Sequence, residues 1–482
     1  MWMIGARLVE RALGFVSIAC FARLLTPADF GLVAMASSVA ALIEVFSAFG
    51  FDWALVRHPA PERAHYDSAW TLRLLLGAAS ATVLVAAGPL AAAFYKQSAV
   101  APLLAVLALS TLVSAAENIG VVDFRRDFQL NKEFLLRSAS RIGGFILGLT
   151  VAYLTRSYWG LVLGTFGARA AATGMSYVLH PYRPRLSLAA AKELLGFSVW
   201  LLVTNLIAFM ASRFADIFVG RVFGPRATGL YSVANEIAHL STSELAAPIN
   251  RAVFSMYSKH ANDREAIQQD FLQVASIIWM VALPIAAGIF ATSREIVVLM
   301  LGPQWTDADV LVRILAVGGG LAVMTANIHY VYIALGQARL STIMAAVVLG
   351  TMVVLAPVGG AMLGVAGVGC AYLVSMAIGV PINYVVLKRL VGLQFHRLWR
   401  RVWRALVAAL AMLALVLSVF PATQPSGPAQ ALVALALKAL LGSGCYFAIL
   451  LAAWRLSGRP EGPESMAISL VRDRVAGILR RR

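Results

Sequence analysis

Ionisable side chains within long apolar stretches are the residues of this 482-residue chain whose types could do chemistry. Arginine suits phosphate groups, because its planar guanidinium can donate two parallel hydrogen bonds to one of them. A charged residue deep in a membrane helix costs about 2.5–3.5 kcal/mol, so it is a candidate for function. We interpret four arginines as candidate ligands for the phosphates or the polar headgroup of an anionic substrate: Arg11, Arg169, Arg213 and Arg313.

Acidic residues and one histidine in the same kind of stretch form a second set of candidates. Such residues could bind and release H⁺ or Na⁺, and so couple or gate a process, or they could form salt bridges that latch parts of the protein together. These residues are Glu44, Asp216, Glu236, His239 and Glu244. Arg213 and Asp216 are three positions apart, which puts them on one face of a helix where they can pair. For each charged residue the alternative is an ion pair that serves structure alone.

Composition indicates what surrounds these charges. Hydrophobic residues make up 60% of the chain and charged residues only 13%, about half the charged fraction of a soluble protein. Most of the surface must therefore face lipid. Apolar stretches of roughly 20 residues, long enough to cross a bilayer, predict an all-α polytopic membrane protein with about fourteen transmembrane helices. The spans are 4–25, 30–50, 69–94, 99–121, 134–155, 157–179, 194–222, 229–256, 271–291, 309–335, 340–361, 364–387, 403–420 and 429–454.

Basic residues are concentrated in alternate loops, which indicates the orientation of the helices. The segments 57–63, 125–132, 183–192 and 388–404 are basic, whereas the turn at 421–428 has no Lys or Arg. Since basic loops stay in the cytoplasm, we expect both termini there. The net charge of +17 is then charge that faces anionic lipid headgroups. No polar segment is long enough to fold as a nucleic-acid-binding domain, so we expect no nucleic acid partner.

One segment occurs twice along the chain. Residues 23–36, RLLTPADFGLVAMA, correspond to residues 221–234, RVFGPRATGLYSVA. Each copy joins two helices, and the turns share a proline that starts a helix and a glycine that relieves crowding one turn later. These are Pro27 with Gly31 and Pro225 with Gly229.

The two copies are separated by six predicted helices, and an even number gives both halves the same orientation in the membrane. We therefore predict two pseudo-symmetric six-helix lobes, related as parallel repeats, followed by two additional helices and a tail. The predicted domains are an N-terminal lobe at 1–185, a C-terminal lobe at 186–392, two transmembrane helices in 393–456 and a basic amphipathic cytoplasmic tail at 457–482.

Residues 23–36 resemble the amino-terminal signature of the Wzx-type polysaccharide and oligosaccharide flippases, a branch of the MOP (multidrug/oligosaccharidyl-lipid/polysaccharide) exporter superfamily. The segments Gly302-Pro-Gln-Trp305 and Ala334-Leu-Gly-Gln-Ala-Arg339 resemble the same family. The resemblance covers essentially the whole chain, including the two additional helices. One departure is that family members often begin with a short basic tail, whereas here an apolar segment starts at Ile4, which we expect to remain as the first span.

The resemblance implies a function and a set of partners. The substrate would be an undecaprenyl-diphosphate-linked oligosaccharide, moved by alternating access from the cytoplasmic to the periplasmic leaflet of the bacterial inner membrane. The product would feed the biosynthesis of exopolysaccharide, capsule or O-antigen, with a polysaccharide polymerase and chain-length machinery as partners beside the membrane lipids. The chemistry is consistent, because a sugar headgroup needs a hydrated cavity to cross lipid and its diphosphate needs cations.

Two rival functions remain at this point. A small-molecule exporter of the related MATE type would use the same two lobes, although such exporters favour cationic drugs, which intramembrane arginines do not suit. A membrane-embedded polysaccharide polymerase or glycosyltransferase would need a large outward loop or a soluble catalytic domain. The sequence has no Gly-x-x-x-x-Gly-Lys phosphate loop, no His-Glu-x-x-His and no clustered cysteines. We therefore expect a secondary-type transporter without enzyme activity, cofactor or metal.

The segment 395–404 has the pattern of an interfacial helix. Three aromatic residues recur at every fourth position, Phe395, Trp399 and Trp403, among four arginines. We expect the aromatic rings to anchor this helix at the membrane surface. The arginines Arg397, Arg400, Arg401 and Arg404 are expected to contact phosphate headgroups.

Overall fold

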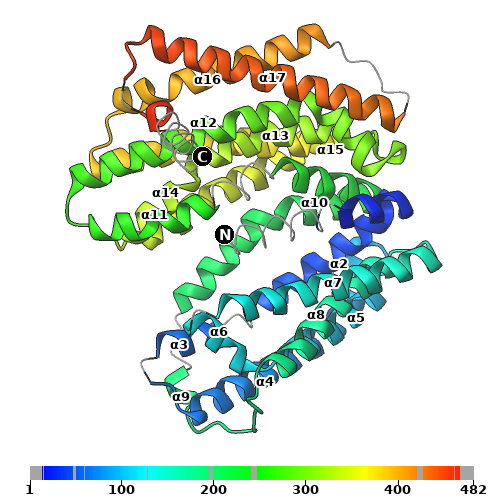
Figure 1. Ribbon diagram of the computed structural model, residues 1–482. Helices are drawn as coiled ribbons and strands as arrows, with labels where there is room; N and C mark the ends of the chain where they lie inside the picture. Colours follow the sequence, from blue (N-terminus) through cyan, green and yellow to red (C-terminus); the bar gives the residue numbers. More distant parts are fainter. Residues whose placement is uncertain are drawn as a thin grey trace, which may run out of the picture. The chain divides into compact units, whose positions relative to one another are not determined.

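The computed structural model describes residues 14, 16–46, 50–58, 60–127, 129–194, 199–239, 247–420, 427–460 and 462–466. Within this part of the chain every regular element is a helix. The chain divides into two compact units, residues 1–232 and 233–482. Figure 1 shows the helices of each unit in the colours of the sequence.

The first unit consists of long helices joined by short turns. After a helical segment at 16–24, its elements are α2 (Pro27–Val45), α3 (Phe51–Arg57), α4 (Arg63–Tyr95), α5 (Val100–Ala115), the short helices η1 (Ile119–Val122) and α6 (Asp123–Arg126), α7 (Leu130–Thr155), α8 (Trp159–Leu179), α9 (Ala191–Leu194) and most of α10 (Val199–Ala238). The long helices α4, α5, α7 and α8 lie side by side (Figure 1).

The second unit has the same character. It comprises the end of α10, then α11 (Ala247–Lys259), α12 (Arg264–Ile296), η3 (Val297–Leu301), η4 (Pro303–Trp305), α13 (Ala308–Ala326), α14 (Ile328–Ala334), α15 (Ala338–Val391), α16 (Phe395–Val419) and α17 (Pro428–Leu456). The two last helices pack against α12 and against each other (Figure 1). Their contact includes a hydrogen bond of 2.6 Å from the Tyr446 hydroxyl to the Met280 carbonyl oxygen.

The helices have the length and the apolarity of membrane spans. Among the described residues nine helices are long and apolar enough to cross a bilayer, and the pair 100–115 and 119–126, bent by 71°, forms a tenth candidate. Large apolar side chains such as Leu90, Leu154 and Met362 are exposed on their surfaces, as expected where lipid is the solvent. The prediction of an all-α polytopic membrane protein is thus confirmed. The count of fourteen helices and the two repeated lobes stay predictions.

Two of the long elements are interrupted by a glycine. The backbone leaves the helical region at Gly224 in α10 (φ 81°) and at Gly364 in α15 (φ 61°). A positive φ is available to glycine without steric cost, so these residues can turn the chain within an otherwise helical stretch. Beyond Gly364 the backbone folds back closely, because a Cβ atom on Gly367 would lie 1.8 Å from the Gly359 carbonyl oxygen.

The start of α2 shows why the chain turns at the repeated segment. Thr26 caps the helix, since the Asp29 N–H donates to its hydroxyl and its own N–H donates to the Asp29 carboxylate at 2.9 Å. Pro27 follows at the first helical position, where its missing N–H leaves no hydrogen bond unmade. The second carboxylate oxygen of Asp29 accepts the Tyr158 N–H at 3.2 Å, which ties this turn to the start of α8.

The pair α7 and α8 packs through small residues. A Cβ atom on Gly144 would lie 2.9 Å from the Gly164 carbonyl oxygen, and one on Gly148 would lie 2.9 Å from that of Gly160. Glycines at every fourth position therefore let the two backbones approach, which is the usual way in which helices associate in lipid. This close packing fixes the position of α8, the helix that carries Arg169.

Candidate functional site

The structure joins Arg169 to Glu44. Arg169 on α8 lies with its Nη2 2.7 Å from the Glu44 Oε1 on α2, and its Nη1 donates to the Thr111 hydroxyl on α5 at 3.1 Å. Thr111 in turn donates to the same Glu44 oxygen at 3.2 Å. Three helices of the first unit thus meet at one polar cluster. The Arg169 and Glu44 side chains retain 29% and 38% of their exposure, so the cluster is accessible from one side.

A second candidate arginine, Arg313, is held at the start of α13. Its guanidinium lies 3.0 Å from one Asp309 oxygen and donates to the other at 3.1 Å. The Ser293 hydroxyl on α12 accepts from Arg313 at 2.9 Å and donates to Asp309. As with Arg169, about a third of the Arg313 side chain remains exposed. Both arginines therefore combine a fixed orientation with access from outside.

The predicted pairing of Arg213 with Asp216 is confirmed, at 3.3 Å on α10. The two partners differ in surroundings: half of the Arg213 side chain is exposed, whereas Asp216 is buried. One carboxylate oxygen of Asp216 has no hydrogen-bond partner among the described residues. The Arg213 guanidinium thus extends outward from a buried acidic anchor.

The remaining candidates do not gather around these arginines in one described cluster. His239 bonds to the Asn235 carbonyl oxygen at 2.9 Å and to the Tyr372 hydroxyl on α15 at 3.1 Å, which is the environment of an interior histidine. Glu236, three positions earlier, is exposed. Arg11 and Glu244 lie outside the described residues, as do the turn at 421–426 and residues 467–482 of the tail.

The repeated turns meet each other. A Cβ atom on Gly31 would lie 1.8 Å from the Pro225 carbonyl oxygen, and one on Gly229 would lie 1.8 Å from the Pro27 carbonyl oxygen. Each glycine also faces the other's backbone nitrogen, at 2.9 and 3.0 Å from the added Cβ atoms. The two contacts are reciprocal, so the copies pack as a local two-fold pair. Only glycine permits this approach, because any side chain would overlap the opposing carbonyl.

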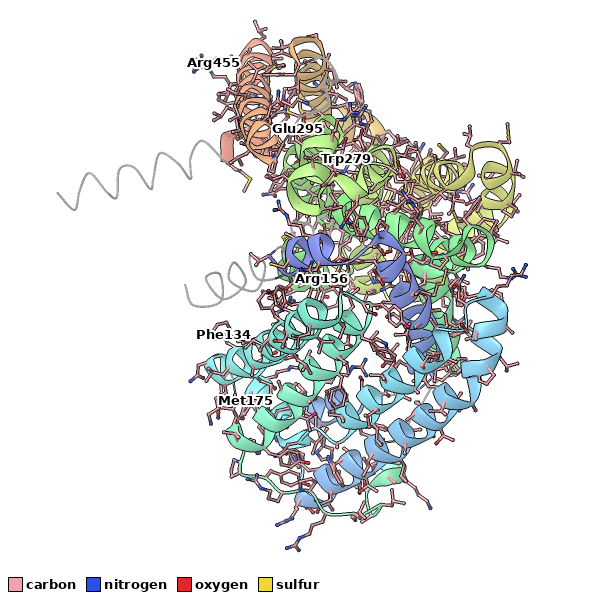
Figure 2. The ribbon with its side chains drawn as sticks, turned by 90° about the vertical axis from the view of Figure 1, so that its right-hand side faces the viewer. Phe134, Arg156, Met175, Trp279, Glu295 and Arg455 are labelled. Atoms are coloured by element: carbon pink, nitrogen blue, oxygen red, sulfur yellow. The ribbon has the colours of Figure 1, made fainter. Side chains whose placement is uncertain are left out.

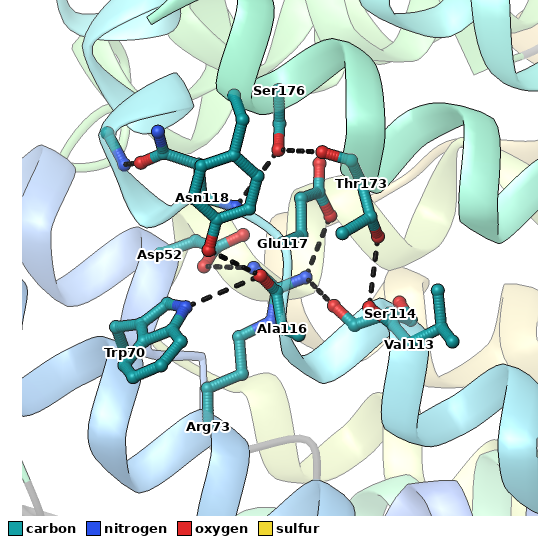
Figure 3. A network of polar contacts seen from close by, with 12 residues as sticks. Asp52, Trp70, Arg73, Val113, Ser114, Ala116, Glu117, Asn118, Thr173 and Ser176 are labelled. Carbon is teal, nitrogen blue, oxygen red and sulfur yellow. Dashed lines mark hydrogen bonds and ion pairs between the residues drawn. The ribbon is translucent and has the colours of Figure 1, made fainter. Parts of the chain in front are cut away.

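A polar network around Arg73 on α4 was not selected from the sequence. Arg73 pairs with Glu117 at 2.8 Å, lies 3.8 Å from Asp52 and donates to the Ser114 carbonyl oxygen at 2.9 Å. Figure 3 shows this guanidinium at the end of α5, where the Ala116 carbonyl oxygen accepts from Trp70 and from Tyr177. The network supplies hydrogen bonds where α5 ends before the bend. The sequence pointed to this network only through Arg73 itself, the one arginine in the predicted span 69–94.

Two buried ion pairs in the second unit were also missed. Lys438 on α17 lies 2.7 Å from Glu295 on α12, with both side chains less than 10% exposed. Figure 2 labels Glu295 where α12 runs beside α17, and Arg455 at the far end of α17 points outward. Lys438 is the only charged residue of the predicted span 429–454, and that isolation was the available signal.

The second of these pairs corrects an expectation. Arg404 does not face lipid phosphates: it is buried and forms a double hydrogen bond with Glu464, at 2.7 and 3.1 Å. The reason is that position 404 faces the interior side of α16, together with Leu398, Val402 and Ala405. Trp399 and Phe395 are exposed in the first turns of α16, which continues without a break to Val419, and their place at the membrane surface stays a prediction.

Comparisons with known proteins show a family and a fold. Residues 20–310 match the family described as "Polysaccharide biosynthesis protein". The lipopolysaccharide biosynthesis protein WzxC of Escherichia coli (strain K12) is 21% identical over 83% of each chain. The succinoglycan biosynthesis transport protein ExoT of Rhizobium meliloti (strain 1021) is 24% identical over 66% of this chain and 65% of its own. Among solved structures, the lipid II flippase MurJ in an inward closed conformation has a TM-score of 0.72 at 15% identity, covering 93% of this chain and 98% of its own.

Proposed function

The chain belongs to the polysaccharide biosynthesis protein family, and we propose that it is a flippase for undecaprenyl-diphosphate-linked oligosaccharides. It moves repeat units from the cytoplasmic to the periplasmic leaflet, where they enter exopolysaccharide, capsule or O-antigen. The names of WzxC and ExoT, which refer to lipopolysaccharide and to succinoglycan transport, support this class of cargo. The chain is a multi-pass membrane protein with the fold of MurJ, and the role we propose for it is transport, not catalysis.

The observation that carries the proposal is the reciprocal contact of the two repeated turns. A transporter of the alternating-access type opens to one side of the membrane while it is closed on the other. By the loop charges, the turns at Pro27 and Pro225 are periplasmic, so we infer that their contact closes the periplasmic side. In this proposal each copy of the repeated segment belongs to one of two six-helix lobes, 1–185 and 186–392. The additional helices follow at 393–456, and both termini lie in the cytoplasm.

The partly exposed arginines are the proposed sites for the diphosphate. Arg169 pairs with Glu44 in the absence of cargo, and a phosphate oxygen can replace that carboxylate because both accept two hydrogen bonds from a guanidinium. Protonation of Glu44, or its neutralisation by Na⁺, would release Arg169 for the cargo and thereby couple transport to the ion. Arg313 with Asp309, and Arg213 with Asp216, offer the same exchange of partners.

The direct test is a deletion strain. We expect lipid-linked repeat units to accumulate on the cytoplasmic leaflet and surface polysaccharide to be lost, with both effects reversed by the natural chain. Loss of a polymerase has a different result, because single repeat units then still reach the outer leaflet. If neither accumulation nor loss of polysaccharide occurs, the proposed function is wrong.

A binding experiment separates the flippase from a small-molecule exporter. Purified protein in detergent is titrated with a polyprenyl-diphosphate-linked oligosaccharide and, separately, with a cationic dye. We expect saturable binding of the lipid-linked sugar, reduced by an excess of polyprenyl diphosphate. Binding of the dye alone would favour the exporter, since the positively charged candidate arginines would repel a cation.

A further inference from the structure

His58, His65 and Glu193 form a cluster of metal-ligating side chains away from the candidate arginines. Each offers one ligand atom, and the three atoms lie within 4.8 Å of one another. His58 follows α3, His65 is in the first turn of α4, and Glu193 is on α9. The two imidazole rings are 4.4 Å apart between centroids, and His65 Nε2 is 2.9 Å from the Glu193 Oε2. Three separate elements thus bring nitrogen and oxygen donors together.

A second observation indicates that the cluster receives a ligand. Nδ1 of His58 is buried and has no hydrogen-bond partner among the described residues. A buried polar nitrogen without a hydrogen bond destabilises the fold, so this ring lacks a partner that the described part of the protein does not provide. Direct coordination of a metal ion by this nitrogen would give it the partner that it lacks among the described residues.

The neighbouring charges leave room for a cation. Arg63, the basic residue next in sequence to the cap of α4, is directed elsewhere: it lies 3.6 Å from Asp67 and donates to the Arg183 carbonyl oxygen. Two thirds of the Glu193 side chain is exposed, so an ion and a water molecule can reach the cluster from solution. The donors carry one negative charge in total when both rings are neutral.

We propose that His58, His65 and Glu193 bind a divalent transition-metal ion of the Zn²⁺ class, with water as the fourth ligand. Two imidazoles and one carboxylate are a common ligand set for Zn²⁺, whereas Mg²⁺ and Ca²⁺ require oxygen ligands. Bond lengths of about 2.0–2.2 Å put the donors roughly 3.4 Å apart in a tetrahedron. Side-chain rotations that draw the present cluster together by about an ångström would therefore complete the site.

Binding has one local consequence at His65. Its Nδ1 now accepts the Glu62 N–H at 3.1 Å, so the proton of the neutral ring is on Nε2 and points to Glu193. A metal on Nε2 moves that proton to Nδ1 and releases the Glu62 N–H to water. The loss of one exposed hydrogen bond is small beside coordination of the ion.

The bound ion would cross-link two segments of the chain. Glu193 belongs to the segment that leads from α8 into α10, and the histidines belong to the turn between α3 and α4. Coordination would fasten that connecting segment to α4 and so restrict the start of α10. This role is independent of the cargo and does not rest on the proposed function.

The test is a titration of the full-length protein with Zn²⁺ alone, purified without a polyhistidine tag and in excess Mg²⁺. We expect one equivalent to bind, with competition from a chromophoric chelator, and the temperature of unfolding in detergent to rise. Glu193→Gln keeps the shape of an exposed residue and should weaken binding about tenfold or more, as should His58→Asn and His65→Asn. His396→Asn changes an exposed histidine outside the cluster and should bind as the natural chain does.

Two results would overturn the site. One is that the natural chain and the His396→Asn variant bind no Zn²⁺, or that they bind it no more tightly than the variants of His58, His65 and Glu193 do. The other is that Glu193→Gln, whose folding is checked by an unchanged unfolding temperature without metal, binds Zn²⁺ with the affinity of the natural chain.

Discussion

Arg169 and Glu44 form an ion pair of 2.7 Å that joins α8 to α2 across 125 positions of the sequence. The Thr111 hydroxyl bridges the two side chains, since it accepts from Arg169 and donates to Glu44. The arginine is therefore oriented before any cargo arrives. A pre-oriented cation that can exchange its carboxylate for a phosphate is the feature on which the proposed transport chemistry depends.

Substitution of Arg169 tests that exchange. Arg169→Ala should weaken binding of a polyprenyl diphosphate to the purified protein about tenfold to a hundredfold, because hydrogen bonds to charged groups contribute about 1.5–3 kcal/mol. Arg169→Lys keeps the charge without the fork geometry and should have an intermediate affinity. Glu44→Gln removes the competing carboxylate and should strengthen binding. If all three variants bind the diphosphate alike, Arg169 serves structure alone.

Alanine at the repeated turns tests the contact between them. Gly31→Ala puts a methyl group where the Pro225 carbonyl oxygen now lies, so the turns must separate by more than 1 Å. We expect a loss of about 1–3 kcal/mol of stability and of most surface polysaccharide, and the same for Gly229→Ala. Unfolding in detergent and complementation of the deletion strain measure these effects.

The control for this experiment is Gly174→Ala, since a Cβ atom added to Gly174 on α8 would meet no atom of a neighbouring element within 4 Å. The double variant is informative as well. Once the first methyl group has separated the turns, the second should cost much less, so the two losses should not add. Full activity of Gly31→Ala, or additive losses in the double variant, would contradict a shared contact.

The buried pair of Lys438 and Glu295 predicts how the additional helices are held. Lys438→Met leaves an unpaired carboxylate in the interior and should lower the free energy of unfolding by about 3–5 kcal/mol. The double variant Lys438→Met with Glu295→Gln removes both charges and should recover most of that loss. Arg137→Ala breaks an exposed pair with Glu133 and should cost at most about 1 kcal/mol. Equal losses in the single and double variants would show that the loss does not come from an unpaired carboxylate in the interior.

His180 predicts a dependence of stability on pH. Burial lowers the pKa of His180, and the nearby Asp123, 3.4 Å away, only partly opposes this effect. The unfolded chain therefore binds the proton more readily than the folded one, so stability is fully present above the ordinary histidine pKa of about 6.5 and decreases as the pH falls below it.

The variant for this test is His180→Asn, whose amide oxygen can still accept the Tyr182 N–H that now donates to Nδ1. Unfolding temperatures measured between pH 7.5 and 5.5 should decrease less steeply for the variant than for the natural chain. An identical slope would mean that His180 takes no part in the pH response.

The membrane character and the all-helical fold class were predictable from the sequence. Insertion of a helix depends on about twenty consecutive residues, a local property that the printed sequence contains. The breaks in α10 and α15 were also local, because Gly224 and Gly364 supply the positive φ that a turn there requires. The duplicated segment could be found by comparing the sequence with itself. Its first copy also carries the family resemblance, which the match over residues 20–310 confirms.

The partners of the charges were not predictable. The sequence offered Glu44 for ion coupling or for a salt bridge without naming a partner, and in the structure it pairs with Arg169. It offered Lys438 as an isolated charge and Arg404 as a lipid contact, yet each has a buried acidic partner from a distant segment. Pairing depends on how each helix is rotated about its axis and on which neighbour it packs against, and neither is encoded in a window of twenty residues. The reciprocal contact of Gly31 with Gly229 shows the same difference. The sequence determined that two similar turns exist. Only the tertiary structure decided that they meet, because the approach of two backbones depends on how helices far apart in the chain pack.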